Sequence, residues 1–291
     1  MILVVGATGL VGGQVCARLV AEGVGARALV RATSSPEKVA GLRAQGVDIV
    51  EGDVRDAASL DAACAGVDAV ICTVSSMPFS YEPGVNDIQT TDLDGVKSVI
   101  DAAARAGVGH FVYTSFSANL DLDFPLGRAK RAVEAHLIDS GMAYTILRPS
   151  CFMEVWLSPA VGFDPANGTV ALYGDGTQPV SYIATADVAA FAVASLTVPA
   201  ARNAVLELGG PEALSQVGAK EVFEEVLGRP AATQSVPVEA LQGQLAAATD
   251  PMQQSFTSLM LCVAKGDAID MSSLLPQFPV QLTTVRQFAT G

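Results

Sequence analysis

The stretch that most constrains the fold lies at the start of the chain, where a short apolar run meets three evenly spaced glycines. The run from Ile2 to Val5 is rich in β-branched residues and predicts a buried strand. The glycines fall where that strand would turn into a helix, and the turn consists of Gly6, Ala7, Thr8, Gly9, Leu10, Val11 and Gly12. Glycine lets the backbone approach a phosphate, and the first helix N–H groups attract the anion. The stretch predicts a dinucleotide-binding loop, although a tight strand-to-helix connection alone would also use these glycines.

The next segments supply the strand–helix–strand context that such a loop needs. A helix is expected from Leu10 to Glu22, followed by a second strand from Ala26 to Val30. An NAD site usually has an acidic residue at the end of this strand, to bind the ribose 2′-hydroxyl. Here the strand ends in Arg31, and hydroxyl side chains follow it. A guanidinium suits a 2′-phosphate, which favours NADP(H), unless Arg31 is a plain surface arginine.

Short apolar runs continue to alternate with helical segments as far as Leu147, and one long helix is expected at 86–106. Beyond Leu147, strands are expected at 179–183 and, in a smaller lobe, at 204–208. This alternation predicts an α/β fold with a doubly wound parallel sheet of the Rossmann type, and a smaller C-terminal α/β lobe. Ligands of such sheets lie outside the carboxyl ends of the strands. At the ends of the third and fourth strands, the candidates for adenine and ribose contact are Asp53, Val54, Thr73, Val74 and Ser75. Asp56 is expected to cap the following helix.

Length and composition bound the remaining possibilities. With 291 residues, half of them hydrophobic, the chain can form a dinucleotide-binding domain at 1–150 and a smaller portion at 151–291, interleaved with the first. The net charge of −13 argues against nucleic acid and anionic membranes as partners. Five scattered cysteines and two histidines form no metal-binding pattern, so no metal is expected. We find no signal peptide and no stretch of about 20 apolar residues, so a cytoplasmic location is expected.

Further motifs resemble one known family. They are Val30-Arg31, Glu51-Gly52-Asp53-Val54, Val112-Tyr113-Thr114-Ser115 and Tyr144-Thr145-Ile146-Leu147-Arg148-Pro149. Together with the glycine loop, they resemble the NmrA-like group of atypical short-chain dehydrogenases/reductases over about residues 1 to 230. The resemblance implies a Rossmann domain that binds NADP(H) and a smaller substrate-binding portion. Phe124-Pro125-Leu126-Gly127 also resembles the quinone and triphenylmethane reductases of that group.

One position departs from the wider superfamily, in which a Tyr-x-x-x-Lys pair performs the proton chemistry. Lys130 fits the lysine, but Leu126 stands four residues before it, where the tyrosine is expected. Lys130 could act as an acid or base in a dry site, as the isoflavone-reductase-like relatives suggest, or could only anchor the nicotinamide ribose. It could also be a plain surface lysine. Ser115, at the end of the fifth strand, is the second candidate for a catalytic contact.

The remaining candidates are apolar. Phe79 and Tyr81 lie on a loop after the fourth strand, where they could close over a substrate or pin the loop to its own domain. Phe116 follows Ser115, and the resemblance places Pro149 and Phe152 beside the nicotinamide. Phe152 and Trp156, four apart, could form an apolar wall, although core packing is an equally good explanation. The apolar stripe at helical spacing, formed by Met252, Phe256, Leu259 and Met260, is interpreted as core, with the lining of a substrate pocket as the alternative.

These patterns support an NADPH-dependent reductase that passes hydride to a small, apolar, electron-poor acceptor such as a quinone or an enone. Such an acceptor tolerates the missing tyrosine, because its reduced form can take protons from solvent. The alternative is a non-catalytic NADP(H) sensor that regulates a partner, as the namesake of the family does. Epimerase or isomerase chemistry is a third hypothesis, which the missing tyrosine weakens most. A homodimer is left open.

Overall fold

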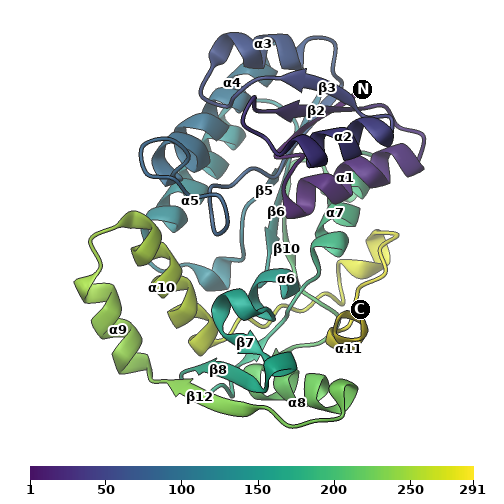
Figure 1. Ribbon diagram of the computed structural model, residues 1–291. Helices are drawn as coiled ribbons and strands as arrows, with labels where there is room; N and C mark the ends of the chain where they lie inside the picture. Colours follow the sequence, from purple (N-terminus) through teal and green to yellow (C-terminus); the bar gives the residue numbers. More distant parts are fainter. The chain divides into compact units, whose positions relative to one another are not determined.

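The computed structural model describes residues 1–291 and divides into two compact units (Figure 1). Neither unit is a continuous stretch of the chain. The first contains Met1–Ser115, Arg128–Leu147 and Val188–Leu206. The second contains Phe116–Gly127, Arg148–Asp187 and Glu207–Gly291. None of the helices is long and apolar enough to span a membrane.

A seven-stranded sheet forms the frame of the first unit, and its strand order is β10-β6-β5-β4-β1-β2-β3. The strands are β1 (Ile2–Val5), β2 (Ala26–Val30), β3 (Asp48–Glu51), β4 (Ala69–Cys72), β5 (His110–Thr114), β6 (Tyr144–Pro149) and β10 (Ala204–Leu208). From β3 to β6 every neighbouring pair is parallel, with Val4 opposite both Ala28 and Ile71 in register. The order reverses at β1, between β2 and β4, which is where sheets of this kind bind ligands. The predicted Rossmann-type fold is confirmed.

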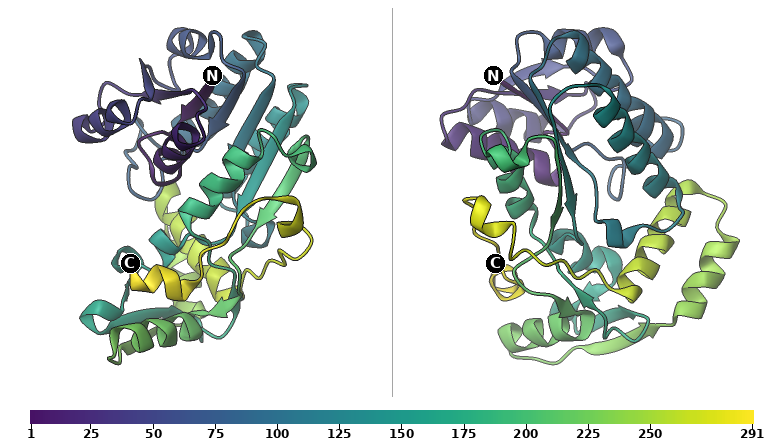
Figure 2. Two further views of the ribbon diagram at one scale, coloured as in Figure 1. Left: turned by 90° about the vertical axis from the view of Figure 1, so that its right-hand side faces the viewer. Right: turned by 180° about the vertical axis from the view of Figure 1, so that it is seen from behind.

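Helices cover both faces of this sheet (Figure 2). The helices α1 and α7 lie on one face, and α3, α4 and α5 on the other, as Figures 1 and 2 show. The bounds are α1 (Leu10–Ala21), α2 (Pro36–Ala44), α3 (Ala57–Cys64), α4 (Val96–Arg105), α5 (Pro125–Asp139) and α7 (Thr185–Ala194). Asp56 caps α3 as expected, since its carboxylate accepts a hydrogen bond from the Ala58 N–H at 3.1 Å.

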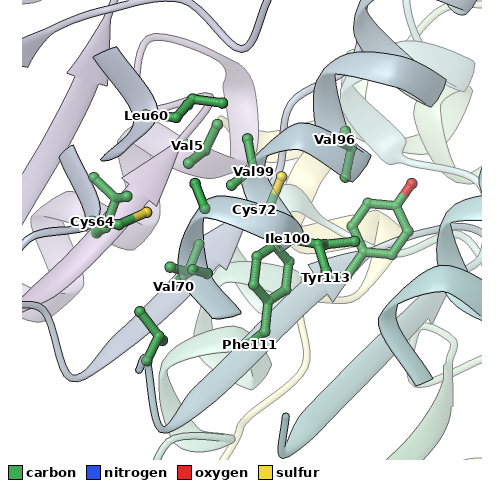
Figure 3. Close-up of a cluster of buried hydrophobic side chains, with 14 of the residues drawn as sticks. Val5, Leu60, Cys64, Val70, Cys72, Val96, Val99, Ile100, Phe111 and Tyr113 are labelled. Atoms are coloured by element: carbon green, nitrogen blue, oxygen red, sulfur yellow. The ribbon is translucent and has the colours of Figure 1, made fainter. Parts of the chain in front are cut away.

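The core of the first unit lies between the sheet and the helices α3, α4 and α5 (Figure 3). Alternate residues of each strand face it, as the two-residue period of a strand requires. Strand residues in this core include Val5, Val70, Cys72, Phe111 and Tyr113, and all are at most 1% exposed. These strands are buried on both faces, which explains their continuous apolar runs.

The second unit is built around smaller sheets. A three-stranded sheet has the order β12-β8-β7, with β12 parallel and β7 antiparallel to β8, and β9 pairs antiparallel with β11. The strands are β7 (Phe163–Asp164), β8 (Thr169–Tyr173), β9 (Pro179–Val180), β11 (Leu214–Ser215) and β12 (Ala232–Val236). The helices are α6 (Met153–Trp156), α8 (Gln216–Leu227), α9 (Val238–Ala247), α10 (Pro251–Lys265) and α11 (Val285–Thr290). The second unit also contains single 3₁₀ turns: η2 (Ala118–Leu120), η3 (Pro159–Val161), η4 (Pro165–Asn167) and η6 (Leu275–Gln277). Another 3₁₀ turn, η5 (Pro199–Ala201), belongs to the first unit.

Three expected elements differ from the structure. The segment 204–208, expected in the small lobe, is the edge strand β10 of the large sheet, because Asn203 N–H donates to Tyr144 O and Ser150 N–H to Leu208 O along β6. The single helix expected at 86–106 consists of a π-helix, η1 (Ile88–Gly95), that continues into α4. The strand expected at 179–183 is only β9, since the backbone of Ser181 bonds to Asp267 instead.

Candidate functional site

The glycine turn is closely packed between β1 and α1. Gly6 has a φ of +88°, which disfavours any side chain, and a Cβ there would lie 2.8 Å from Val74 N. A Cβ on Gly12 would overlap the carbonyl oxygen of Gly6. Gly9 is the N-cap of α1 and supplies no side-chain cap, and no acidic residue lies in the first turn. The N-terminus of α1 therefore presents its N–H groups and its partial positive charge to an anion.

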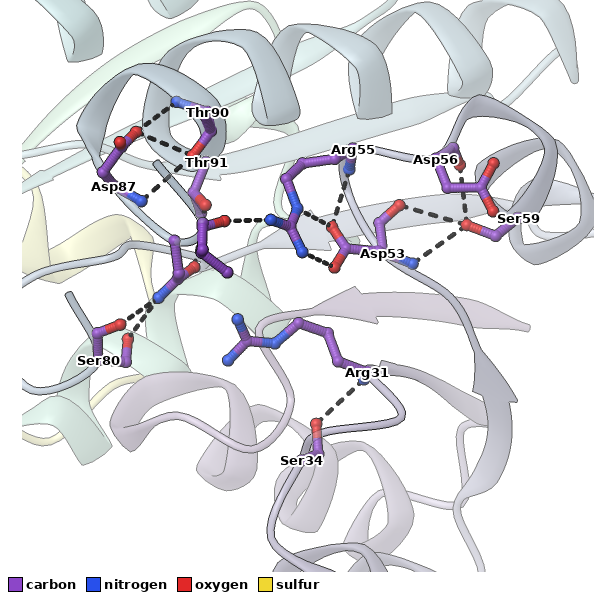
Figure 4. Close-up of polar contacts among 12 residues, drawn as sticks. Arg31, Ser34, Asp53, Arg55, Asp56, Ser59, Ser80, Asp87, Thr90 and Thr91 are labelled. Atoms are coloured by element: carbon purple, nitrogen blue, oxygen red, sulfur yellow. Dashed lines mark hydrogen bonds and ion pairs between the residues drawn. The ribbon is translucent and has the colours of Figure 1, made fainter. Parts of the chain in front are cut away.

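Two cationic side chains lie near this turn. Arg31 follows β2, and its backbone N–H donates to Ser34 Oγ at 3.0 Å, which fixes the start of the loop (Figure 4). Lys38, in the first turn of α2, donates from Nζ to the carbonyl oxygen of Thr8 at 2.9 Å. Lys38 was not predicted from the sequence, because its contact is with a backbone oxygen.

Asp53, a predicted ribose or adenine contact, has its carboxylate bound by protein. Arg55 donates to it from Nε at 2.9 Å and from Nη2 at 2.7 Å (Figure 4). These hydrogen bonds lower the pKa of Asp53, to which the positive charge of Arg31 also contributes. Arg55 further donates to the carbonyl oxygen of Val85, and so connects the end of β3 to the loop after β4. Val54, the next predicted contact, is buried against Gly95.

The end of β4 carries the three predicted contacts at 73–75. Thr73 Oγ1 donates to Val5 O at 3.2 Å and lies close to Gly6, so this segment packs directly on the glycine turn. Val74 is half-buried. Ser75 Oγ donates to a carboxylate oxygen of Asp92 at 2.6 Å. Asp92 is fully buried and is a polar residue that the sequence analysis did not single out.

Lys130 is a buried lysine of α5, not a surface residue, with its side chain 6% exposed. Its Nζ lies 3.7 Å from Asp92 Oδ1, donates to Thr114 O at 3.4 Å and stands 5.2 Å from the centroid of the Tyr113 ring. Because an ammonium has three N–H donors, at least one of them has no acceptor in the protein. Thr114 Oγ1, beside it in the chain, is also buried without a hydrogen-bond partner.

Ser115, the other catalytic candidate, is 6% exposed at the end of β5. Its Oγ accepts a hydrogen bond from Arg131 Nη1 at 3.2 Å, and the same nitrogen donates to Glu134 Oε1 at 2.5 Å. The hydroxyl proton of Ser115 is therefore directed away from Arg131. Tyr113 carries the phenol nearest in sequence, but its hydroxyl is buried without a partner, and burial raises its pKa well above the ordinary value. Tyr113 is thus a poor proton donor.

The aromatic candidates Phe79 and Tyr81 lie on the loop after β4, as predicted. Phe79 is 60% exposed, which is unusual for so large an apolar side chain, whereas Tyr81 is half-buried. The hydrogen bond from Arg55 to Val85 O and the paired residues Glu82 and Asn86 hold the loop in place.

The remaining candidates belong to the second unit. Pro149 is buried at the end of β6, and Phe116 stacks on Phe124 with ring centroids 5.9 Å apart. Phe152 precedes α6 and is its N-cap, so it does not share a helical face with Trp156. Trp156 stacks on Phe256 of α10, with centroids 6.3 Å apart and an interplanar angle of 12°.

The apolar stripe on α10, expected to be core, is only half-buried. The buried face of this helix consists instead of Ser255, Thr257, Ser258, Leu261, Cys262 and Val263. The half-buried stripe comprises Met252, Phe256, Leu259 and Met260, and through Phe256 it joins Trp156. An apolar surface of this kind with an aromatic stack suits a flat apolar ligand.

The first unit fits a dinucleotide that carries an additional phosphate. The glycine turn is packed so closely that a Cβ on Gly6 or Gly12 would overlap neighbouring atoms, the N-terminus of α1 has no side-chain cap, and Arg31 and Lys38 supply two cations. No group of three or more His, Cys, Asp or Glu side chains could hold a metal ion. The five cysteines are all buried and free, and burial raises the pKa of Cys72 to about 11, so they are unreactive thiols.

Fold and site thus define a Rossmann-type dinucleotide-binding protein. The sequence matches the NmrA-like family over residues 1–289, and the chain belongs to that family.

Its relatives include named reductases. A (4-alkanoyl-5-oxo-2,5-dihydrofuran-3-yl)methyl phosphate reductase of Streptomyces griseus is 38% identical over 253 residues, covering 86% of this chain and 82% of that protein. An NAD(P)H azoreductase of Xenophilus azovorans is 32% identical over 240 residues, covering 82% and 78%. The NADPH complex of the quinone oxidoreductase QOR2 from Escherichia coli superposes with a TM-score of 0.78 at 25% identity, covering 100% and 99%. The expected class is confirmed: the chain is an NADP(H)-dependent oxidoreductase.

Proposed function

We propose that this oxidoreductase transfers hydride from NADPH to a small, apolar, electron-poor acceptor such as a quinone or an enone. The observation that carries the proposal is the environment of Lys130, a buried ammonium with no phenol four residues before it. Reduction of an ordinary ketone needs a proton at the carbonyl oxygen during hydride transfer. A quinone or an enone spreads the developing negative charge over a conjugated system, so its reduced form can be protonated afterwards by solvent.

The relatives support an acceptor of this electronic type. The substrate named for the Streptomyces griseus reductase has a furanone ring whose double bond bears two carbonyl groups, which makes it an electron-poor enone. The other names are azoreductase and quinone oxidoreductase, and these activities likewise reduce conjugated, electron-poor bonds. For this chain, the particular acceptor is part of the proposal.

The geometry of the first unit supports the following proposed roles in cofactor binding. The N-terminus of α1, with Thr8 and Leu10 to Gly12, holds the pyrophosphate, and Arg31 and Lys38 hold the 2′-phosphate. The residues at the ends of β3 and β4 border the adenosine. Bound NADPH supplies a hydride from its nicotinamide. Lys130 donates its remaining N–H to the nicotinamide ribose. Pro149 and Phe152 are assigned to the nicotinamide end of the cofactor by the family resemblance alone.

The substrate roles are assigned by chemistry. Ser115 accepts from Arg131 and keeps its own proton for a carbonyl oxygen, which helps to stabilise developing negative charge there. The apolar contacts come from Phe79, Tyr81, Phe116, Phe152 and Trp156, and the stack of Trp156 on Phe256 favours a flat ring. Of these residues, Phe152 and Trp156 lie within 151–291, the portion that the sequence analysis assigned to substrate binding.

The test is NADPH oxidation with a panel of quinones, enones, azo compounds and simple ketones. We expect turnover with the conjugated acceptors and none with the ketones. Lys130→Ala should lower kcat/KM by about 100-fold, because it leaves Asp92 without its cation and removes the donor. Lys265→Ala, at the exposed end of α10, is the matched control and should behave like the unchanged protein.

The absence of turnover would be informative as well. Tight NADPH binding without turnover on any acceptor would refute the proposed acceptor class and favour the regulatory alternative. A cytoplasmic location and a homodimer remain predictions from the sequence. Size-exclusion chromatography with light scattering decides the second of these.

A further inference from the structure

Asp92 is a fully buried carboxylate of the first unit, and the sequence suggests no role for it. Its carboxylate is 0% exposed and accepts three hydrogen bonds. Ser75 Oγ donates to Oδ1 at 2.6 Å, and Ser76 donates to Oδ2 from Oγ at 2.6 Å and from its backbone N–H at 3.0 Å. A buried carboxylate is retained only when donors and a cation compensate for its lost hydration. Here the cation is Lys130.

The geometry around Lys130 leaves little freedom for its side chain. Asp92 Oδ1 lies 3.7 Å from Nζ, Thr114 O accepts at 3.4 Å, and the face of the Tyr113 ring lies beneath the ammonium. One of these contacts comes from η1, through Asp92, and two come from neighbouring residues of β5, Tyr113 and Thr114. The N–H that has no acceptor in the protein is therefore directed to one place rather than free to rotate.

Asp92 reaches this position from an unusual piece of backbone. It lies in the π-helix η1, whose start is fixed by a reciprocal pair of hydrogen bonds between Asp87 and Thr90. Single π turns inside helices occur often at functional sites, where they re-aim a side chain. The wider turn ends at Gly95, and α4 then continues as an ordinary helix.

We infer that Asp92 is a positioning residue for NADP(H): held by Ser75 and Ser76, it fixes the Lys130 ammonium so that its remaining N–H meets the nicotinamide ribose. The inference depends on the role proposed above for Lys130. It extends that role to Asp92 and to the hydroxyls at the end of β4. On this account Ser75 acts on the cofactor indirectly, through Asp92 and Lys130.

A binding experiment tests the inference without any acceptor. The dissociation constants of NADPH and of 2′,5′-ADP, which lacks the nicotinamide riboside, are measured for Asp92→Asn. We expect NADPH to bind about tenfold more weakly, the size of one charge-assisted hydrogen bond, and 2′,5′-ADP to bind within about twofold of the unchanged protein. Asp94→Asn is the matched control, because Asp94 lies in the same π-helix but is exposed, and its carboxylate accepts a hydrogen bond from Gln89 rather than from the residues around Lys130.

A double variant tests whether Asp92 acts through Lys130. If it does, Asp92→Asn combined with Lys130→Ala weakens NADPH binding no further than Lys130→Ala alone. Independent, additive losses would overturn the inference. So would an equal loss for NADPH and 2′,5′-ADP, since a general structural role affects both ligands.

A milder variant covers the case in which Asp92→Asn does not fold. Ser76→Ala removes one donor and no charge, and we expect a loss of about threefold for NADPH with 2′,5′-ADP unaffected. Unchanged NADPH binding in Ser76→Ala would then overturn the inference. The two proposals are tested by different measurements. The absence of turnover would refute the proposed acceptor class, whereas only the dissociation constants described here can refute the role of Asp92.

Discussion

Gly12 offers a prediction that depends directly on the packing of the glycine turn. A Cβ at this position would overlap the Gly6 carbonyl oxygen and would stand 2.9 Å from Thr73 Oγ1. Most of the overlapped atoms are backbone, so β1 and α1 must move apart before Gly12→Ala can be accommodated. The displaced atoms are the same ones that form the predicted pyrophosphate cradle, so stability and NADPH affinity should fall together.

The expected change in the free energy of unfolding of Gly12→Ala is the sum of two opposing effects. Overpacking a closely packed site destabilises by about 1–3 kcal/mol. Replacing glycine by alanine within a helix stabilises by about 0.5–1 kcal/mol. Gly41, inside α2, has no atom within 4 Å of an added Cβ, so Gly41→Ala should show only the stabilising effect. The difference between the two variants isolates the overlap.

Thermal unfolding and NADPH titration measure both consequences. At about 2–4 °C per kcal/mol, Gly12→Ala should lower the melting temperature by several degrees relative to Gly41→Ala. We also expect NADPH to bind at least tenfold more weakly to Gly12→Ala and equally well to Gly41→Ala. If Gly12→Ala matched Gly41→Ala in both measurements, the account of the glycine turn would be wrong.

Further predictions concern the cations, the buried phenol and the aromatic stack. Arg31→Ala and Lys38→Ala should each weaken NADPH binding about tenfold and leave NADH binding within about twofold of the unchanged protein. If the ratio of the NADPH and NADH affinities did not change, the assignment of these residues to the 2′-phosphate would be wrong. Tyr113→Phe should leave the free energy of unfolding unchanged or raise it by up to about 1 kcal/mol, because the removed hydroxyl has no hydrogen-bond partner. Turnover should be unchanged, and a loss of turnover would mean that the phenol takes part in the reaction. Trp156→Ala and Phe256→Ala should each raise KM for aromatic quinones more than for a small aliphatic enone. An equal rise in KM for both kinds of acceptor would argue against stacking of the acceptor on these rings.

The sequence was sufficient for the parallel core of the fold because local signals and the global arrangement agree there. Buried strands such as β1 and β4 carry continuous apolar runs, and their helices have clear caps such as Asp56. The strand β10 has an equally clear pattern, but pattern alone does not say which sheet a strand joins. Its assignment depends on backbone bonds to β6, about 60 residues earlier.

The site was predictable only where function imposes a local motif. The glycine turn and Arg31 have such motifs, and Lys130 was found through its family position. Asp92 was missed because its partners Ser75 and Ser76 lie 17 and 16 residues away and meet it only after η1 and β4 pack together. Lys38 was missed because its contact is with a backbone oxygen, Thr8 O, which no spacing rule reveals.

The most direct test of the account is to follow the hydride itself. The protein is mixed with a cyclic enone and NADPH that carries deuterium on the transferred position of the nicotinamide, and the product is analysed by mass spectrometry and NMR. We predict one deuterium on the carbon β to the carbonyl, with a proton from solvent on the adjacent carbon. A product without deuterium, or NADPH that stays reduced with every conjugated acceptor although it binds tightly, would contradict hydride transfer to an electron-poor acceptor.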